Sequence, residues 1–281
     1  MTKAGKTKKA TVQVVKYLVI ALLVCILLFP IWWMLVGSLR PYYTLISLDD
    51  VAFWPKDFTV ENYVKIFSQA KYLRYFANSF IVSGGTVLVT LLIAIPAAYS
   101  FSRFKFGGKS AVLSAVQSVQ MFPIVVILIS LYTFYKQWGM LDTYRGVILA
   151  DVTFALPLSI TLLKSFFDTV PNALDESAKI DGATPSQILK NVKIPMVMPS
   201  ITICSFLTLT NSFKLFDQNL ALTAGEPANS SELLALNIFN TFYGRNGWEG
   251  VGQAKAVVFF VIVAVIAITQ NKITRSREVQ Q

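Results

Sequence analysis

The sequence contains a series of apolar runs, each of the length needed to cross a bilayer, and these leave few possible folds. The clearest occupies residues 17–39, which carry no charged side chain and place Trp32 and Trp33 near one end, as suits a membrane interface. Only 14% of the residues are charged, whereas soluble domains carry about 25%. Because backbone groups in lipid must be satisfied within the chain, helices are favoured. The sequence predicts an all-α integral membrane protein.

The apolar runs predict six transmembrane helices. After the first, at 17–39, we expect spans at about residues 76–102, 110–134, 146–167, 195–222 and 251–271. The other expected segments are a cytoplasmic N-terminal tail at 1–16, an external loop with an interfacial helix at 40–75, a coupling loop at 168–194 within the five-span region 76–271, and a cytoplasmic C-terminal tail at 272–281.

Basic residues flank these runs and predict their orientation. Lys3 and Lys16 precede the first run, Arg103 and Lys109 follow the second, and Lys272 follows the last. Because Lys and Arg accumulate on the cytoplasmic side, both termini are expected inside the cell. A cleaved signal peptide would have an apolar core of about 7–15 residues, and the first run is longer than that. We therefore expect a multi-pass protein of the cell membrane.

Composition also excludes several classes of function. The net charge is +10, but the basic residues lie at the edges of apolar runs and form no single patch, so nucleic-acid binding is not expected. The chain has no histidine, and Cys25 and Cys204 both lie inside apolar runs, where they read as small buried hydrophobes. We expect no disulfide, metal site or cofactor, and membrane lipid as the surrounding partner.

The longest polar stretch in the second half of the chain, residues 171–199, predicts two short helices separated by a turn. Pro171 suits the first position of the first helix, and the pair Asp181-Gly182 ends it, since glycine accepts a left-handed conformation. Thr184 is an expected N-cap for the second helix, with Gln187 in capping-box position. This polar hairpin joins the fourth and fifth apolar runs.

The order of residues in this hairpin resembles the EAA loop of importer-type ABC permeases. Three segments match the family pattern in spacing: Glu176-Ser177-Ala178, Asp181-Gly182-Ala183, and Ile194-Pro195 through Pro199. Ser177 replaces the first alanine, a small residue for another. The stretch AYSFSRFKFGGK at 98–109, with Asn78 before it, is similar to carbohydrate-uptake permeases like the maltose-transporter inner-membrane permease.

The resemblance implies the type I ABC importer permease fold, in which a helix of the loop docks on a separate ATPase subunit. Small residues permit close approach, and Glu176 would contact a basic partner. The residues so implied are Ala173, Leu174, Glu176, Ser177, Ala178, Asp181, Gly182 and Ala183. The family works as two permease chains, here expected to be homologous but different, with two ATP-binding subunits and an extracytoplasmic sugar-binding protein. The substrate would be a mono- or oligosaccharide or a related polyol.

The chain lacks a nucleotide-binding motif of its own. The nearest approach to G-x-x-x-x-G-K-[ST] is Gly108-Lys109-Ser110, but Arg103 stands where the first glycine is required, and a membrane span precedes it where a strand is needed. We therefore expect a transport subunit that is not an enzyme, with ATP used by a partner subunit.

The fifth apolar run is the most polar of the six. Polar groups at membrane depth usually face a bundle interior or a cavity. We expect six residues to line the substrate pathway: Asn211, Phe213, Lys214, Phe216, Asp217 and Gln218. On a continuous helix Asn211, Lys214 and Gln218 share one face, and Asp217 lies within reach of Lys214. The alternatives are that these groups satisfy one another in packing or lie at the outer membrane surface.

Other expectations concern polar residues elsewhere and rival functions. Gln117, Gln120 and Asp151 are expected to form packing hydrogen bonds, and the loop at 224–250 to reach the binding protein. A permease of the same architecture for a non-sugar solute remains open. An ion-coupled secondary transporter would usually show internal repeats and mid-membrane acids, and a membrane scaffold would not need the docking loop.

Overall fold

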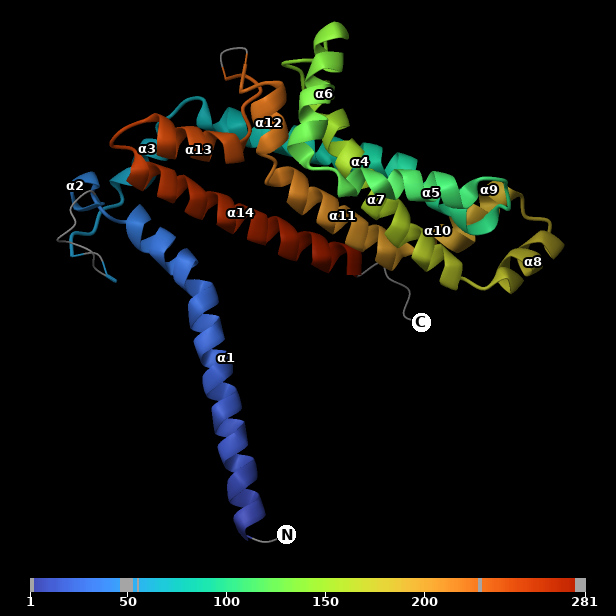
Figure 1. Cartoon of the computed structure of the whole chain (residues 1–281), viewed down its shortest axis with the longest axis horizontal. Helices are drawn as coiled ribbons and strands as arrows, with labels where there is room; N and C mark the ends of the chain where they lie inside the picture. The colour runs from blue at the N-terminus through green and yellow to red at the C-terminus, as the bar shows by residue number, and fades with distance from the viewer. Residues whose placement is uncertain (1–2, 46–52, 55, 227–228, 276–281) are drawn as a thin grey trace. The chain divides into compact units, whose positions relative to one another are not determined.

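The computed structural model describes residues 3–45, 53–54, 56–226 and 229–275, and these contain helices and no strands. Within these described residues, four helices are long and apolar enough to cross a membrane: α1 (Lys3–Ser38, its apolar part Val12–Ser38), α4 (Tyr72–Arg103), α7 (Tyr144–Thr169) and α14 (Glu249–Arg275) (Figure 1). Two bent helix pairs raise the number to six if each is one span. The all-α, multi-span prediction is confirmed. Parts of the expected external loop (46–52 and 55) and C-terminal tail (276–281) lie outside the described residues.

The chain divides into two compact units, residues 1–69 with 238–259 and residues 70–237 with 260–281. In the first unit, the interfacial helix expected in 40–75 is only α3 (Glu61–Phe67), following α2 (Tyr42–Leu45). The buried Asn62 anchors α3 by donating to the carbonyl oxygens of Ser38 and Arg40, at 2.9 and 3.0 Å. The second span begins at Tyr72, four residues before the expected boundary at 76.

The core of the second unit lies where α4 packs on α7 and α11 (Met198–Phe213). Small residues make this approach possible: Ala94 and Ala98 are fully buried, and a Cβ on Gly85 would lie 2.7 Å from Ile148 of α7. Membrane helices commonly associate through such residues, because there is little hydrophobic drive between helices in lipid. The tight contact between α4 and α7 positions the polar hairpin at one end of both helices.

The third span is a bent pair and not the single helix expected at 110–134. α5 (Lys109–Ser118) and a short 3-10 turn (Val119–Met121) are followed by α6 (Ile124–Gln137) at an angle of 103°. Pro123 lies at the break, and Phe122 before it is extended (φ −83°, ψ 139°). A residue that precedes proline is disfavoured in the helical region, which favours an end of the helix at this point.

The rest of the second half of the chain consists of shorter helices than those of the long spans. The polar hairpin contains α8 (Asn172–Ile180), α9 (Pro185–Gln187), a π-helical turn (Ile188–Lys193) and α10 (Ile194–Met196). The expected fifth span, 195–222, is divided between α11 and α12 (Asp217–Leu222). The expected external loop 224–250 contains a further helix, α13 (Leu234–Gly244), whose first residues Leu234 and Leu236 are fully buried.

Candidate functional site

Helix α8 is short and lies beyond the ends of α4 and α7 (Figure 1). Pro171 is its N-cap in an extended conformation (φ −60°, ψ 136°), so the helix begins one residue later than predicted. It ends as predicted at Asp181-Gly182. Gly182 has φ +81°, its N–H donates to Lys179, and the N–H of Ala183 donates to Ala178, at 3.0 and 2.9 Å. This pair of bonds is a Schellman motif, which stops a helix by satisfying its last carbonyls.

The predicted capping box at the second helix of the hairpin is confirmed. The N–H of Gln187 donates to the Thr184 hydroxyl at 3.4 Å, and the N–H of Thr184 donates to the Gln187 side chain at 2.8 Å. The chain then continues through the π-helical turn Ile188–Lys193. π-Helical turns occur frequently at functional sites. Both ends of the loop between α8 and α9 are therefore held by local hydrogen bonds.

Most of the residues implied for coupling are available at the surface of this unit. Glu176 and Ser177 are exposed, and Glu176 forms no ion pair within the described part of the chain. The large side chain of Ile180 is 87% exposed at the end of α8. The other exposed members of the set are Ala173, Leu174, Asp181 and Gly182, and the half-buried members are Ala178 and Ala183.

A buried ion pair fastens α8 to the rest of the second unit. The ammonium of Lys193 lies 2.5 Å from the Asp175 carboxylate and 4.7 Å from the centre of the Tyr99 ring, and Lys193 is fully buried. Asp175 lies in the first turn of α8, Lys193 ends the π-helical turn, and Tyr99 belongs to α4. No local pattern in the sequence predicts that Lys193 pairs with Asp175. The position of Lys193 directly before an apolar run was the one available signal.

A second basic residue holds the end of α7, where the hairpin begins. The Arg103 guanidinium, at the end of α4, donates to the carbonyl oxygens of Phe167 and Val170 at 2.9 and 2.6 Å. The last carbonyls of a helix have no partner within it, and Arg103 supplies one from another helix. The sequence had indicated only the cytoplasmic side for this residue. α4, α7 and α8 are thus joined by two basic side chains.

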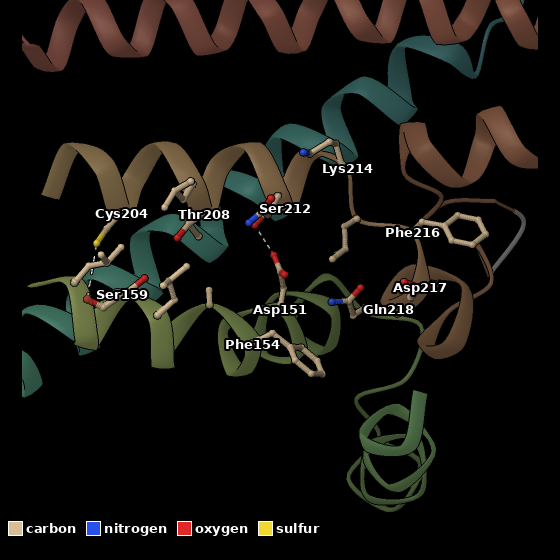
Figure 2. A pocket seen from close by; sticks show the side chains of 16 residues that line it. Asp151, Phe154, Ser159, Cys204, Thr208, Ser212, Lys214, Phe216, Asp217 and Gln218 are labelled. Carbon is tan, nitrogen blue, oxygen red and sulfur yellow. Dashed lines mark hydrogen bonds between the residues drawn. The ribbon is translucent and has the colours of Figure 1, made fainter. Parts of the chain in front are cut away.

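A cavity of about 260 Å³ lies between α7 and the α11–α12 segment (Figure 2). Five of the six predicted pathway residues line it, namely Asn211, Lys214, Phe216, Asp217 and Gln218. Phe213 does not: it is 1% exposed and packs edge-on against Phe80, with ring centres 5.0 Å apart. The fifth apolar run therefore carries most of the polar wall of one cavity.

The predicted helical face in the fifth run does not form, because the helix breaks. α11 ends at Phe213 and α12 begins at Asp217. Between them Leu215 is buried with Val82, Val147 and Leu233, and burial of this side chain favours the break. Lys214 and Asp217 form no ion pair in the described residues. The break, and not helical spacing, turns Gln218 back toward the cavity.

Asp151 combines the expected packing role with a place in the cavity. Its carboxylate accepts a hydrogen bond from the Ser212 hydroxyl, which joins α7 to α11 and confirms the packing prediction (Figure 2). The same residue also lines the cavity, which sequence reasoning missed, because nothing local places residue 151 beside residues 211–218. Of the other two, Gln117 donates to Thr161 at 3.2 Å, whereas Gln120 is exposed.

The segment before α13 is fixed to the start of α4 and to α12. The Asn78 amide donates to the carbonyl oxygens of Ser230 and Glu232, both at 2.8 Å, and Asn219 accepts from the N–H of Leu233 at 3.0 Å. These bonds hold residues 230–233 in place, in a segment that the sequence predicted only as a loop. The predicted reach of this segment toward a binding protein stays a prediction.

Comparison with known proteins places the chain in a family. Residues 74–278 match the model described as the binding-protein-dependent transport system inner membrane component. The inner membrane ABC transporter permease protein YcjP of Escherichia coli is 32% identical over 70% of this chain and 72% of its own length. The trehalose transport system permease protein SugB of Mycobacterium tuberculosis is 29% identical over 88% and 89%.

Two further comparisons differ in what they cover. The probable starch degradation products transport system permease protein AmyD of Thermoanaerobacterium thermosulfurigenes is 47% identical, but over only 41% of this chain and 39% of its own length. A bacterial ABC transporter involved in the import of the acidic polysaccharide alginate has one chain with the same fold, at a TM-score of 0.82, 18% identity and coverage of 97% and 98%. With the family match over residues 74–278, these findings show that the chain belongs to the inner-membrane components of binding-protein-dependent transport systems, as a multi-pass ABC importer permease.

Proposed function

We propose that this permease forms half of the translocation pathway for a mono- or oligosaccharide, or a related polyol, delivered by an extracytoplasmic sugar-binding protein. The names of several relatives support a carbohydrate. They include the trehalose permease SugB, the trehalose/maltose permease MalG of Thermococcus litoralis and the galactooligosaccharides permease GanQ of Bacillus subtilis. The partners proposed are a second, homologous but different permease chain and two ATP-binding subunits, which use the ATP.

The observation that carries the proposal is the exposed α8, which is short, closed at its end by a Schellman motif and fastened to the unit by one buried ion pair. We assign α8 as the element that docks on an ATP-binding subunit from the cytoplasm. Ala173, Ser177 and Ala178 permit close approach. Glu176 is the charge that we expect to meet a basic residue of the ATPase. The remaining members of the proposed docking set are Leu174, Asp181, Gly182 and Ala183.

The ion pair of Asp175 with Lys193, together with the contact of Lys193 with the Tyr99 ring, connects this docking helix directly to α4. A displacement of α8 moves Asp175, the ion pair carries that motion to Lys193, and the π-helical turn leads directly into α10 and α11. Helices that are tightly packed move as units and not by continuous deformation. Motion of α8 would therefore reach α11, which lines the cavity of about 260 Å³.

We further propose that the substrate pathway is lined by Asn211, Phe213, Lys214, Phe216, Asp217 and Gln218. Five of these residues share a cavity wall with both amide and aromatic groups, which is a combination that suits sugars. Phe213 would act from behind the wall, through its contact with Phe80.

The test of the coupling role is a charge reversal on α8. The permease is reconstituted with its partner chain, its ATPase and a sugar-loaded binding protein, and wild type is compared with Glu176→Lys. We expect at least a tenfold loss of stimulated ATP hydrolysis, because a reversed charge in a desolvated contact costs about 2–5 kcal/mol. Glu61→Lys, an exposed glutamate on α3, is the control and should remain near wild type. Equal stimulation in wild type and Glu176→Lys would refute the docking role.

A further inference from the structure

Two polar side chains in the wall of the cavity are almost completely buried. Asp151 of α7 is 6% exposed and Gln218 of α12 is 5% exposed. Figure 2 shows both side chains directed into the space between α7 and the α11–α12 segment. They come from elements more than sixty residues apart in the sequence, so only the tertiary fold brings them to one place.

Asp151 is bonded within the protein by one hydroxyl, and Gln218 by no group among the described residues. Asp151 accepts from the Ser212 hydroxyl, but it has no ion-pair partner within the described residues. The Gln218 amide makes no hydrogen bond among the residues described, and it lines the cavity. Ionisable and polar groups at membrane depth are costly, and they typically mark a pathway or a binding site. A buried amide without a partner points to a ligand that supplies one.

The rest of the wall combines further polar side chains with an apolar and aromatic part. Phe154 and Phe216 lie on opposite elements of the same cavity, and Leu158 and Leu207 extend the apolar surface. A small number of convergent polar groups in a mostly apolar pocket is typical of small-molecule sites. The volume of about 260 Å³ lies just below the range of roughly 300–1,000 Å³ for such sites. The cavity therefore suits one ring of a sugar and not a whole oligosaccharide chain.

We propose that Asp151 and Gln218 form a subsite that binds one sugar ring of the cargo on its way through the membrane. The carboxylate accepts hydrogen bonds from neighbouring hydroxyl groups, and the amide both donates and accepts. The apolar part of the wall, which includes Phe154 and Leu158, would contact the apolar face of the ring. This inference rests on the proposed function, because it requires a carbohydrate cargo. It adds a binding residue, Asp151, from a helix to which no pathway role had been assigned.

The test measures sugar transport and ATP hydrolysis separately in proteoliposomes that contain the whole importer. Radiolabelled trehalose, maltose and a galactooligosaccharide serve as probes, each with the loaded binding protein. In Asp151→Asn and Gln218→Leu we expect uptake to fall at least tenfold, while ATP hydrolysis stimulated by the binding protein stays within twofold of wild type. The ATP consumed per sugar transported therefore rises. Loss of a merely structural contact would lower both rates together with the amount of assembled complex.

Two matched variants separate binding from packing. Asp142→Asn removes an exposed carboxylate just before α7, at a residue with φ 58° that asparagine tolerates, and it should transport as wild type does. Ser212→Ala removes the hydrogen bond that joins α11 to Asp151 but leaves the carboxylate in place. If Asp151 binds sugar, Ser212→Ala is clearly less damaging to uptake than Asp151→Asn. Equal damage in the two variants would show that Asp151 only packs the helices.

The outcomes also distinguish this inference from the proposed function. If wild type transports a probe and Asp151→Asn transports it equally well, the subsite is wrong and the sugar function stands. If wild type hydrolyses ATP with its binding protein but takes up none of the sugars, the carbohydrate function fails, and the subsite fails with it.

Discussion

Lys193 shows how one buried charge can determine the position of a whole helix. Its ammonium is enclosed by Asp175 of α8 and the face of Tyr99, so the first turn of α8 cannot leave α4 without exposing or orphaning a charge. Asp175 also lies at the positive end of the α8 dipole, which favours a carboxylate there. Arg103 fixes the end of α7 in a similar way, by donating to Phe167 and Val170.

At the residue scale, we predict that Lys193→Met destabilises the purified complex more than Lys193→Met combined with Asp175→Leu. Removal of one member of a buried pair leaves an uncompensated charge and costs about 3–5 kcal/mol, whereas an apolar pair of similar volume is often neutral. Thermal unfolding midpoints report the difference. Lys190→Met is the control, because Lys190 lies in the same π-helical turn but is exposed. A double variant as unstable as the single one would contradict this account of the pair.

At the scale of the element, α8 depends on how it ends. Gly182 has φ +81°, and a Cβ there would meet no atom within 4 Å, so any effect of Gly182→Ala comes from the backbone alone. A side chain in the left-handed region costs about 1–2 kcal/mol. We predict faster hydrogen exchange across 172–183 in this variant, together with a lower coupling of ATP hydrolysis to uptake.

The matched control for that prediction is Gly107→Ala. Gly107 also has open space around its Cβ position, but its φ is not positive. Its substitution should leave exchange in α8 unchanged. If both glycine variants accelerate exchange in α8 equally, the left-handed turn is not what holds the end of this helix.

Elements also differ in how far their form follows from local sequence. The capping box of Thr184 and Gln187 and the turn at Gly182 were predictable, because each depends on residues within one turn of helix. Pro123 marks its bend locally as well, although the apolar run at 110–134 predicts one continuous span. The break after Phe213 depends on the burial of Leu215 among three residues from distant segments, and no local pattern contains that information.

At the scale of the molecule, the orientation in the membrane follows from charge, and it can be measured. The positive-inside pattern and the position of α8 predict that Ser177 faces the cytoplasm. In a background with Cys25 and Cys204 replaced by serine, Ser177→Cys should react with a membrane-impermeant maleimide in inside-out vesicles and not in right-side-out ones. Asp142→Cys should show the opposite pattern. Labelling of Ser177→Cys from the outside would reject the proposed docking surface.

The class of the molecule follows from patterns along the chain: apolar runs demand helices in a membrane, and the ordered residues of the polar hairpin identify the kind of transport protein. These are properties of length, charge and short-range spacing. Three features depend instead on how the helices pack: Lys193 pairs with Asp175, Asn78 holds the segment before α13, and Asp151 and Gln218 face one cavity. The physical reason is that each of these contacts joins groups from different elements. Their partners are selected by how α4, α7 and α11 pack, and not by their neighbours along the chain.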